Sequence, residues 1–217
     1  MKKNILLFGA NSYIAKVFTG NYSTDYTIHP VYRNNPGAEL NIDFTSANDY
    51  GSFAEKINFR IDAILFFQGL NPSMSAFEIT DEHFTKMMKI NLIGPALILQ
   101  SLKDKLAANA VIIFFSSIAK KKGSYDPSYG AAKSGLVGLM HSLANTYKDQ
   151  RFNIISLGLV EGSPVFNQMS DDFRKRHAER MQNGSFIKAE NVADVIDMLI
   201  NNENMNRADI PLDGGFS

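Results

Sequence analysis

The 217-residue sequence contains no cysteine, which excludes disulfide bonds and thiolate metal sites and permits a reducing compartment. The four histidines are scattered and form no pair at metal-ligand spacing, so no metal is expected. Neither charge predominates, because 22 Lys and Arg residues balance 22 Asp and Glu residues. This balance gives no electrostatic reason to expect nucleic acid or an anionic membrane as a partner.

Long apolar runs are also missing, and no stretch approaches the roughly 20 apolar residues that a membrane-spanning helix requires. A basic start precedes the apolar residues 5–8, as in the opening of a signal peptide. Gly9, Asn11 and Ser12 end that run too early, however, and no small-residue cleavage site follows. We therefore expect a cytoplasmic protein whose partners are small molecules or other proteins.

What the sequence does contain is an alternation of short apolar runs with segments of helical periodicity. The runs cover residues 5–8, 27–32, 63–67, 111–115 and 153–157, and the helical segments roughly 13–19, 47–57, 81–106, 127–147 and 191–200. Short, unalternating runs are typical of strands buried on both faces. The pattern predicts one α/β domain over residues 1–217, a doubly wound parallel sheet with helices on both faces, which binds ligands at the carboxyl ends of its strands.

A serine pair, a tyrosine and a lysine follow the fourth run. Ser116 and Ser117 come directly after it, and Tyr129 comes twelve residues after Ser117. Tyr129 and Lys133 are four residues apart on a predicted helix, so both project from one face and the lysine can approach the phenol oxygen. Glycines later in this helix cost about 1 kcal/mol each in helix propensity, which indicates close approach by a cofactor or a neighbouring helix.

Ser117 followed by Tyr129-x-x-x-Lys133 resembles the motif of the classical-type short-chain dehydrogenase/reductase family. The resemblance implies a Rossmann-like, NAD(P)-dependent oxidoreductase that transfers a hydride between the nicotinamide and a carbonyl or secondary alcohol, with Tyr129 as general acid/base. Ser117 is then expected to hold the substrate oxygen. Lys133 and the positive nicotinamide are expected to favour the phenolate of Tyr129, whose ordinary pKa is about 10.

The turn after the first run, residues 9–15, lies where this family binds the cofactor pyrophosphate at a helix N-terminus. It is a degenerate version of the family's glycine-rich turn, because Tyr13 and Ala15 stand at two glycine positions and only Gly9 is kept. The alanine is a mild change, whereas the tyrosine side chain should crowd or cover the phosphates. The candidate cofactor-binding residues here are Gly9, Asn11, Ser12, Tyr13 and Ile14.

Arg33 follows the second run, and no residue from 27 to 35 is acidic. NAD-preferring sites place a carboxylate at this position, whereas an arginine can pair with a 2′-phosphate, so we expect NADP(H) to be preferred over NAD(H). An arginine that is merely exposed at a strand end is the alternative. The resemblance adds Asp43 and Phe44 beside the adenine, Gln68 and Gly69 after the third run, and Tyr129, Lys133, Gly158 and Val160 near the nicotinamide.

The long helical segment contains Asn91 and Pro95 in the order Asn-x-x-Gly-Pro. Pro95 has no N–H, so the carbonyl four residues earlier loses its partner and the helix axis should bend at Asn91. In the family the matching asparagine lies at a helix kink and holds a water connected to the active-site lysine. Asn91 is therefore a fourth candidate catalytic residue.

Residues 162–188 correspond to the family's variable substrate lid, and a charged stretch at 171–180 fits either an anionic substrate or a solvated helix of mixed charge. Two alternatives to a dehydrogenase stay open. One is a non-catalytic NADP(H)-binding sensor or scaffold, favoured by the eroded turn and by Leu157 in place of a proline; the other is a sugar-type epimerase or dehydratase. Family members commonly pair through their two long helices, so we expect a homodimer or homotetramer.

Overall fold

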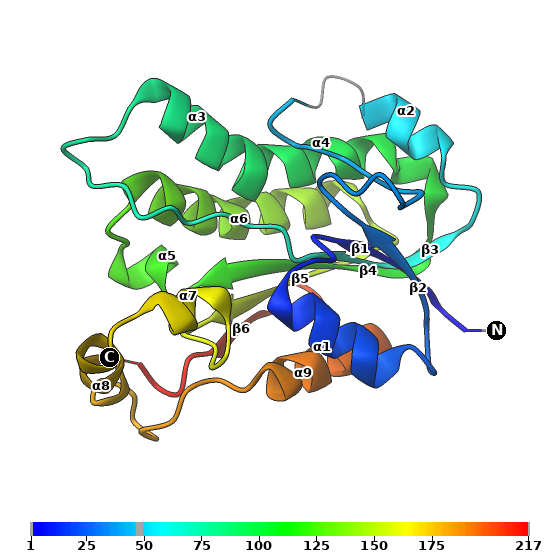
Figure 1. Cartoon of the computed structure of the whole chain (residues 1–217). Coiled ribbons are helices and arrows are strands. Elements are labelled where there is room, and N and C mark those ends of the chain that lie inside the picture. Colours follow the sequence, from blue (N-terminus) through cyan, green and yellow to red (C-terminus); the bar gives the residue numbers. More distant parts are fainter. Residues whose placement is uncertain (1, 47–49, 217) are drawn as a thin grey trace.

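The computed structural model describes residues 2–46 and 50–216. They form a six-stranded, wholly parallel sheet in the order β2-β1-β3-β4-β5-β6 with helices on both faces (Figure 1). The predicted doubly wound α/β fold is thus confirmed. Residues 47–49, where the second helical segment was predicted to begin, lie outside the described residues.

The strands are β1 (Asn4–Phe8), β2 (Thr27–Val31), β3 (Ile61–Phe66), β4 (Leu106–Ser117), β5 (Arg151–Leu157) and β6 (Asp209–Leu212). The helices before β4 are α1 (Tyr13–Tyr22), α2 (Tyr50–Glu55), α3 (Asp81–Met88), the π-helix η1 (Lys89–Ile93), α4 (Gly94–Ser101) and the 3₁₀-helix η2 (Lys103–Lys105). Those after it are α5 (Ala119–Lys122), α6 (Pro127–Thr146), α7 (Pro164–Gln168), α8 (Asp171–Ala178) and α9 (Ala189–Asn201).

Two parts of the helical prediction were wrong. The segment predicted at 81–106 ends earlier, at Ser101, because Leu106 already pairs with Ile61 as the first residue of β4. The helices α5 and α7 were missed because four and five residues are too short to show a helical period.

Alternate residues of the central strands enter two hydrophobic clusters on opposite faces of the sheet. In β1, Leu6 and Phe8 join the cluster that includes residues of α2, α4 and α6, while Ile5 and Leu7 join the cluster that includes residues of α1 and α9. Figure 1 shows α4 and α6 over one face and α1 and α9 over the other. Both sets of side chains are buried, which is why these runs carry no polar alternation.

The strand β2 departs from this pattern because it lies at the edge of the sheet and pairs only with β1 among the described strands. Thr27 and Pro30 are exposed, so the expectation that every run is buried on both faces is wrong here. An edge strand accommodates Pro30, which has no N–H for a ladder bond. None of the helices within residues 2–46 and 50–216 is long and apolar enough to cross a membrane.

Candidate active site and cofactor cleft

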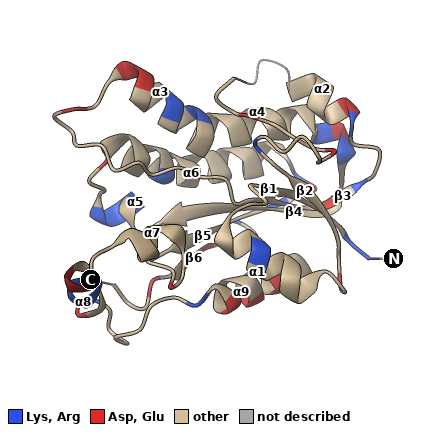
Figure 2. Ribbon diagram, in the orientation of Figure 1, with Lys and Arg blue, Asp and Glu red and all other residues tan. Residues whose placement is uncertain are grey.

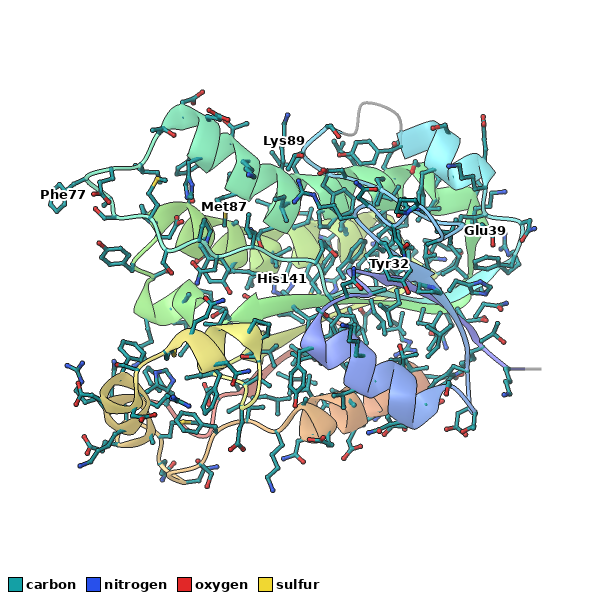
Figure 3. All side chains as sticks on the ribbon, viewed as in Figure 1. Tyr32, Glu39, Phe77, Met87, Lys89 and His141 are labelled. Carbon is teal, nitrogen blue, oxygen red and sulfur yellow. The ribbon has the colours of Figure 1, made fainter. Side chains whose placement is uncertain are left out.

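A cleft of about 260 Å³ lies at the carboxyl ends of β1, β2 and β3. Eight predicted cofactor residues line it: Gly9, Asn11, Ser12, Arg33, Asp43, Phe44, Gln68 and Gly69. Sequence reasoning missed Phe8, Ala10, Val31, Tyr32, Ile42, Phe67, Leu70 and Ile90, which also line it. Each of these missed residues lies within two positions of a predicted site residue, so their place next to those residues in the sequence was the feature that could have identified them. Tyr32, labelled in Figure 3, marks the β2 side of the cleft.

The floor of the cleft requires glycine at position 9. Gly9 has φ +77°, and a Cβ there would lie 2.5 Å from the backbone nitrogen of Gln68. The β1–α1 turn can therefore pass over the end of β3 only without a side chain. Ser12 then caps α1, accepting a hydrogen bond from the Ala15 N–H at 3.2 Å, so the positive end of the helix dipole faces the cleft.

Gln68 supplies the observation that best tests whether a dinucleotide fits. Its side-chain Oε1 is buried and has no hydrogen-bond partner among the described residues, although Gln68 lines the cleft. A buried acceptor without a donor is unfavourable, and a cofactor hydroxyl would satisfy it. Together with the N-terminus of α1, this acceptor fits a nucleotide with ribose and phosphate groups.

Arg33 and Asp43 form an ion pair on the β2 side of the cleft, with Arg33 Nε donating to Asp43 Oδ2 at 2.8 Å. Burial opposes ionisation of Asp43, but hydrogen bonds from Thr45 and from Arg33 outweigh it and lower the pKa of the carboxyl. The Arg33 side chain is 66% exposed. The Arg33 guanidinium is therefore largely exposed on the cleft, while the Asp43 carboxylate beside it already accepts hydrogen bonds from Arg33 and Thr45.

Six predicted cofactor residues do not line this cleft: Tyr13, Ile14, Gly158 and Val160, and the catalytic candidates Tyr129 and Lys133. The hydroxyl of Tyr13 reaches the loop after β5, where a Cβ on Gly162 would lie only 3.0 Å from it, and Tyr13 does not line this cleft; that its side chain crowds the phosphates stays a prediction. The side chain of Ile14 packs on the α1–α9 core cluster and that of Val160 belongs to it. A Cβ on Gly158 would lie 3.0 Å from Asp213 Cα, so this glycine is explained by packing against the C-terminal turn.

The catalytic candidates meet at the end of β4. Ser117 ends that strand, and Tyr129 and Lys133 lie on α6, so the predicted shared helix face is confirmed. The Ser117 hydroxyl lies near enough to the Tyr129 phenol to lower its pKa. Burial raises the pKa of the Tyr129 phenol and the Ser117 hydroxyl partly offsets this. In the chain alone, burial determines the direction of this pKa shift; the effect expected of Lys133 together with the positive nicotinamide stays a prediction.

Lys133 is itself buried, with 5% of its surface exposed. Its Nζ donates to the Phe115 carbonyl at 2.8 Å and lies 5.6 Å from the centroid of the Tyr129 ring. Burial lowers the pKa of Lys133 from 10.5 to about 8. A group with a pKa near neutrality can give up and regain a proton readily at physiological pH.

Asn91 lies in η1, the π-helical turn between α3 and α4. The predicted interruption before Pro95 takes this form: the Gly94 N–H bonds to the carbonyl of Lys89, five residues back. Asn91 Nδ2 donates to the carbonyls of Met87 at 3.1 Å and of Leu70 at 3.2 Å. The side chain thus bridges the helix break and the segment that leaves the cleft.

Gly69 joins the cofactor cleft to the catalytic candidates. It lines the cleft, and a Cβ there would lie 3.3 Å from Asn91 Oδ1 and 3.6 Å from Lys133 Nζ. Both side chains lie against Gly69. Asn91, Lys133 and the cleft therefore meet around this glycine.

The lid region contains α7 and α8, and its charges are largely paired within α8. Arg174 lies 2.7 Å from Asp171, and Arg176 lies 2.9 Å from Asp172. Figure 2 shows both signs of charge mixed on α8. Of the two interpretations of this stretch, the structure favours a solvated helix of mixed charge.

The comparisons with known proteins agree with this fold. A family model described as enoyl-(acyl carrier protein) reductase matches residues 21–217. A short chain dehydrogenase, adrF, from Penicillium roqueforti is 24% identical over 208 residues, covering 87% of this chain and 81% of that protein. The 3-oxoacyl-[acyl-carrier-protein] reductase MabA of Mycobacterium bovis is 25% identical over 171 residues, covering 72% of this chain and 66% of that protein.

Solved structures show the same fold. A short-chain dehydrogenase/reductase from Brucella melitensis superposes with a TM-score of 0.88 at 20% identity, covering 99% of this chain and 98% of that one. A short-chain dehydrogenase/reductase from Serratia marcescens does so with a TM-score of 0.87 at 18% identity and the same coverage. The fold and site define a nucleotide-binding α/β oxidoreductase. The chain belongs to the short-chain dehydrogenase/reductase family of NAD(P)-dependent oxidoreductases.

Proposed function

We propose that this protein interconverts a carbonyl compound and its secondary alcohol with NADP(H), and that Tyr129 is the general acid/base. The observation that carries the proposal is the convergence of Ser117, Tyr129 and Lys133 at the end of β4, next to a cleft with an unpartnered acceptor. When NADP(H) is bound, hydride chemistry comes from its nicotinamide. The remaining tasks belong to side chains of this chain.

The hydroxyls of Ser117 and Tyr129 lie close together at the end of β4, so a substrate oxygen placed between them can accept from both. In the reducing direction the Tyr129 O–H breaks and its proton moves to that oxygen as the alcohol forms. Lys133 can then return a proton to Tyr129, and the side chains of Asn91 and Lys133 both lie against Gly69. The proton path to solvent would then run through Lys133 and a water held by Asn91.

NADP(H) preference is supported by the exposed Arg33 guanidinium on the cleft and by the engagement of Asp43 with Arg33 and Thr45. A carboxylate already holding these donors is a poor acceptor for a ribose 2′-hydroxyl, whereas the arginine can pair with a 2′-phosphate. Use of NADP(H) in biosynthetic reduction would suit the cytoplasmic location that we expected.

A 3-oxoacyl thioester is the first substrate to test, because the matching family model and MabA carry acyl-carrier names. The experiment is a fluorescence titration with NADPH and NADH, followed by NADPH oxidation with acetoacetyl-CoA. Tight binding that prefers NADPH, together with oxidation of NADPH, supports the proposal. Binding without turnover on any carbonyl favours a sensor, product without net cofactor oxidation favours an epimerase, and binding of neither cofactor overturns the proposal.

A further inference from the structure

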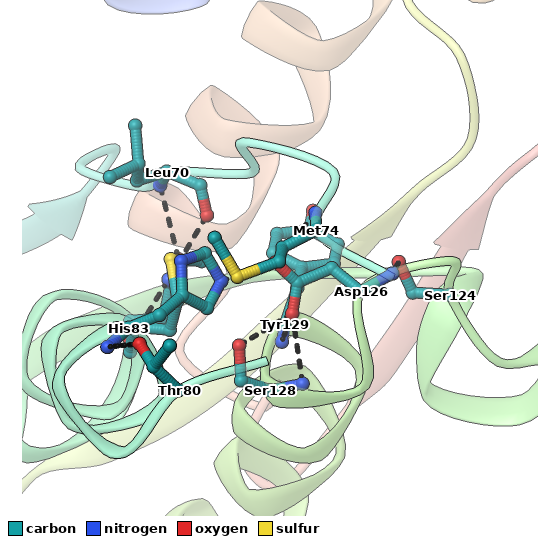
Figure 4. A network of polar contacts seen from close by, with 10 residues as sticks. Leu70, Met74, Thr80, His83, Ser124, Asp126, Ser128 and Tyr129 are labelled. Carbon is teal, nitrogen blue, oxygen red and sulfur yellow. Dashed lines mark hydrogen bonds and ion pairs between the residues drawn. The ribbon is translucent and has the colours of Figure 1, made fainter. Parts of the chain in front are cut away.

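The buried carboxylate of Asp126 joins three segments beside Tyr129 (Figure 4). Its Oδ1 accepts from the N–H groups of Ser128 at 2.9 Å and Tyr129 at 3.2 Å, which caps the first turn of α6. Its Oδ2 accepts from the Met74 N–H at 3.4 Å and lies 2.7 Å from Nε2 of His83 on α3. One side chain therefore connects the Tyr129 helix, a loop and a second helix.

The loop in question, residues 70–77, is held at two points. Leu70 bonds to Asn91 through both its N–H and its carbonyl, and Met74 bonds to Asp126. Ser73, between these points, has φ +60°, an unfavourable conformation for a residue with a side chain. External contacts are thus needed to keep loop 70–77 in this shape.

This loop carries apolar side chains past the catalytic candidates. Leu70 lines the cofactor cleft and is still 36% exposed, and Phe77 is fully exposed at the tip of the loop (Figure 3). Because Met74 and the Tyr129 N–H bond to the same carboxylate, the loop passes directly by the start of the Tyr129 helix. A substrate that reaches Tyr129 from this side meets an apolar edge.

A buried carboxylate needs strong donors, and His83 is the one that comes from another helix. Burial opposes ionisation of Asp126, but hydrogen bonds from Ser128, His83 and the backbone of Tyr129 and Met74 lower its pKa. Without the imidazole, Oδ2 keeps only the long Met74 contact among the bonds of the described residues. The His83 bond therefore decides how firmly Asp126 can hold the loop.

We propose that His83 and Asp126 are positioning residues that fasten loop 70–77 to the first turn of α6, so that the loop forms one wall of the substrate site beside Tyr129. The proposal rests on the proposed function for the role of Tyr129 as the catalytic group. The fastening itself is a property of the chain without cofactor or substrate. It can therefore be tested separately from turnover.

The test is hydrogen exchange by mass spectrometry on the cofactor-free protein, following peptides that cover residues 70–77. His83→Leu removes the donor, and His83→Gln keeps an N–H donor in a side chain of similar reach. We expect His83→Leu to speed exchange in loop 70–77 by about tenfold or more and His83→Gln to stay close to wild type. Ile196→Val, a substitution of a buried α9 residue, controls for general destabilisation and should leave the loop unchanged.

Unchanged protection in His83→Leu, or equal loss in the Gln and Leu variants, would overturn the proposal. Kinetics with NADPH and acetoacetyl-CoA give a second arm: the KM for acetoacetyl-CoA should rise about tenfold in His83→Leu, while kcat and NADPH affinity change little. A purely structural role would lower the active fraction and leave KM constant. If wild type binds no NADPH, the proposed function fails while the exchange result still decides the fastening.

Discussion

Lys133 Nζ donates to the Phe115 carbonyl at 2.8 Å, and this bond lies in an interior that leaves only 5% of the lysine exposed. The position is unfavourable for an ammonium group, which is why the pKa of Lys133 falls to about 8. The buried ammonium of Lys133 therefore destabilises the fold, whereas the proposed catalytic role requires the lysine.

Replacing Lys133 by Met should stabilise the fold near neutral pH while removing turnover. The pKa of Lys133 is about 8 in the folded protein and 10.5 ordinarily, so burying the charged lysine costs at most about 3 kcal/mol of folding free energy. The substitution also loses the bond to the Phe115 carbonyl, which offsets about 1 kcal/mol of this gain. Wild type binds its proton less tightly when folded, so its stability rises with pH from about 8 to 10.5. Urea denaturation should show an advantage of about 1–2 kcal/mol for the variant near pH 7 that disappears near pH 10. A variant less stable than wild type at neutral pH would contradict this.

Tyr129→Phe should lower turnover of acetoacetyl-CoA by roughly 10²- to 10⁴-fold, because the lost hydroxyl acts by proton transfer. Cofactor affinity should change little, since the ring stays in place and the lost hydroxyl acts mainly in the transition state. Stopped-flow turnover and NADPH fluorescence measure the two quantities. Equal turnover in variant and wild type would exclude Tyr129 as the acid.

Arg33→Asp should weaken NADPH binding by roughly 10- to 100-fold and NADH binding far less, because it removes the partner of the 2′-phosphate and adds repulsion. Asp43→Asn is the matched control, since it removes the ion pair but keeps the arginine on the cleft. That variant should retain the preference for NADPH. Titrations of both cofactors against both variants measure this, and parallel losses for NADPH and NADH would show that Arg33 does not select the cofactor.

We expect the chain to be at least a dimer that pairs through the face of α3, η1 and α4. Phe84, Ile93 and Leu97 leave 39–44% of their surface exposed on these elements, an apolar stripe suited to burial by a second copy. Leu97→Glu should then halve the mass measured by light scattering at micromolar concentration. Met198→Glu, on α9, should leave at least the dimer intact. A monomeric wild type would contradict the assignment.

The sequence predicted what depends on local pattern. Alternating runs were enough for the sheet, the spacing of Tyr129 and Lys133 for their shared helix face, and Pro95 for the break at Asn91. Contacts between distant segments carried no such signal. The His83–Asp126 bond spans 43 positions, and the raised pKa of Tyr129 reflects burial, which helical periodicity does not reveal.

Gly94 joins the helix break to the cleft, because a Cβ there would lie 2.5 Å from Cγ of Phe44 and 2.8 Å from the Lys89 carbonyl. Gly94→Ala should therefore cost about 1–3 kcal/mol by overpacking and also weaken NADPH binding, since Phe44 lines the cleft. Gly20→Ala on α1, where nothing lies within 4 Å of a new Cβ, should instead stabilise by about 0.5–1 kcal/mol through helix propensity. Urea denaturation compares the two. Both substitutions add the same methyl group to a helix, so opposite signs would show the cost of the contacts with Phe44 and the Lys89 carbonyl. Two stabilised variants would mean that the π-helical turn and the Phe44 ring adjust without cost.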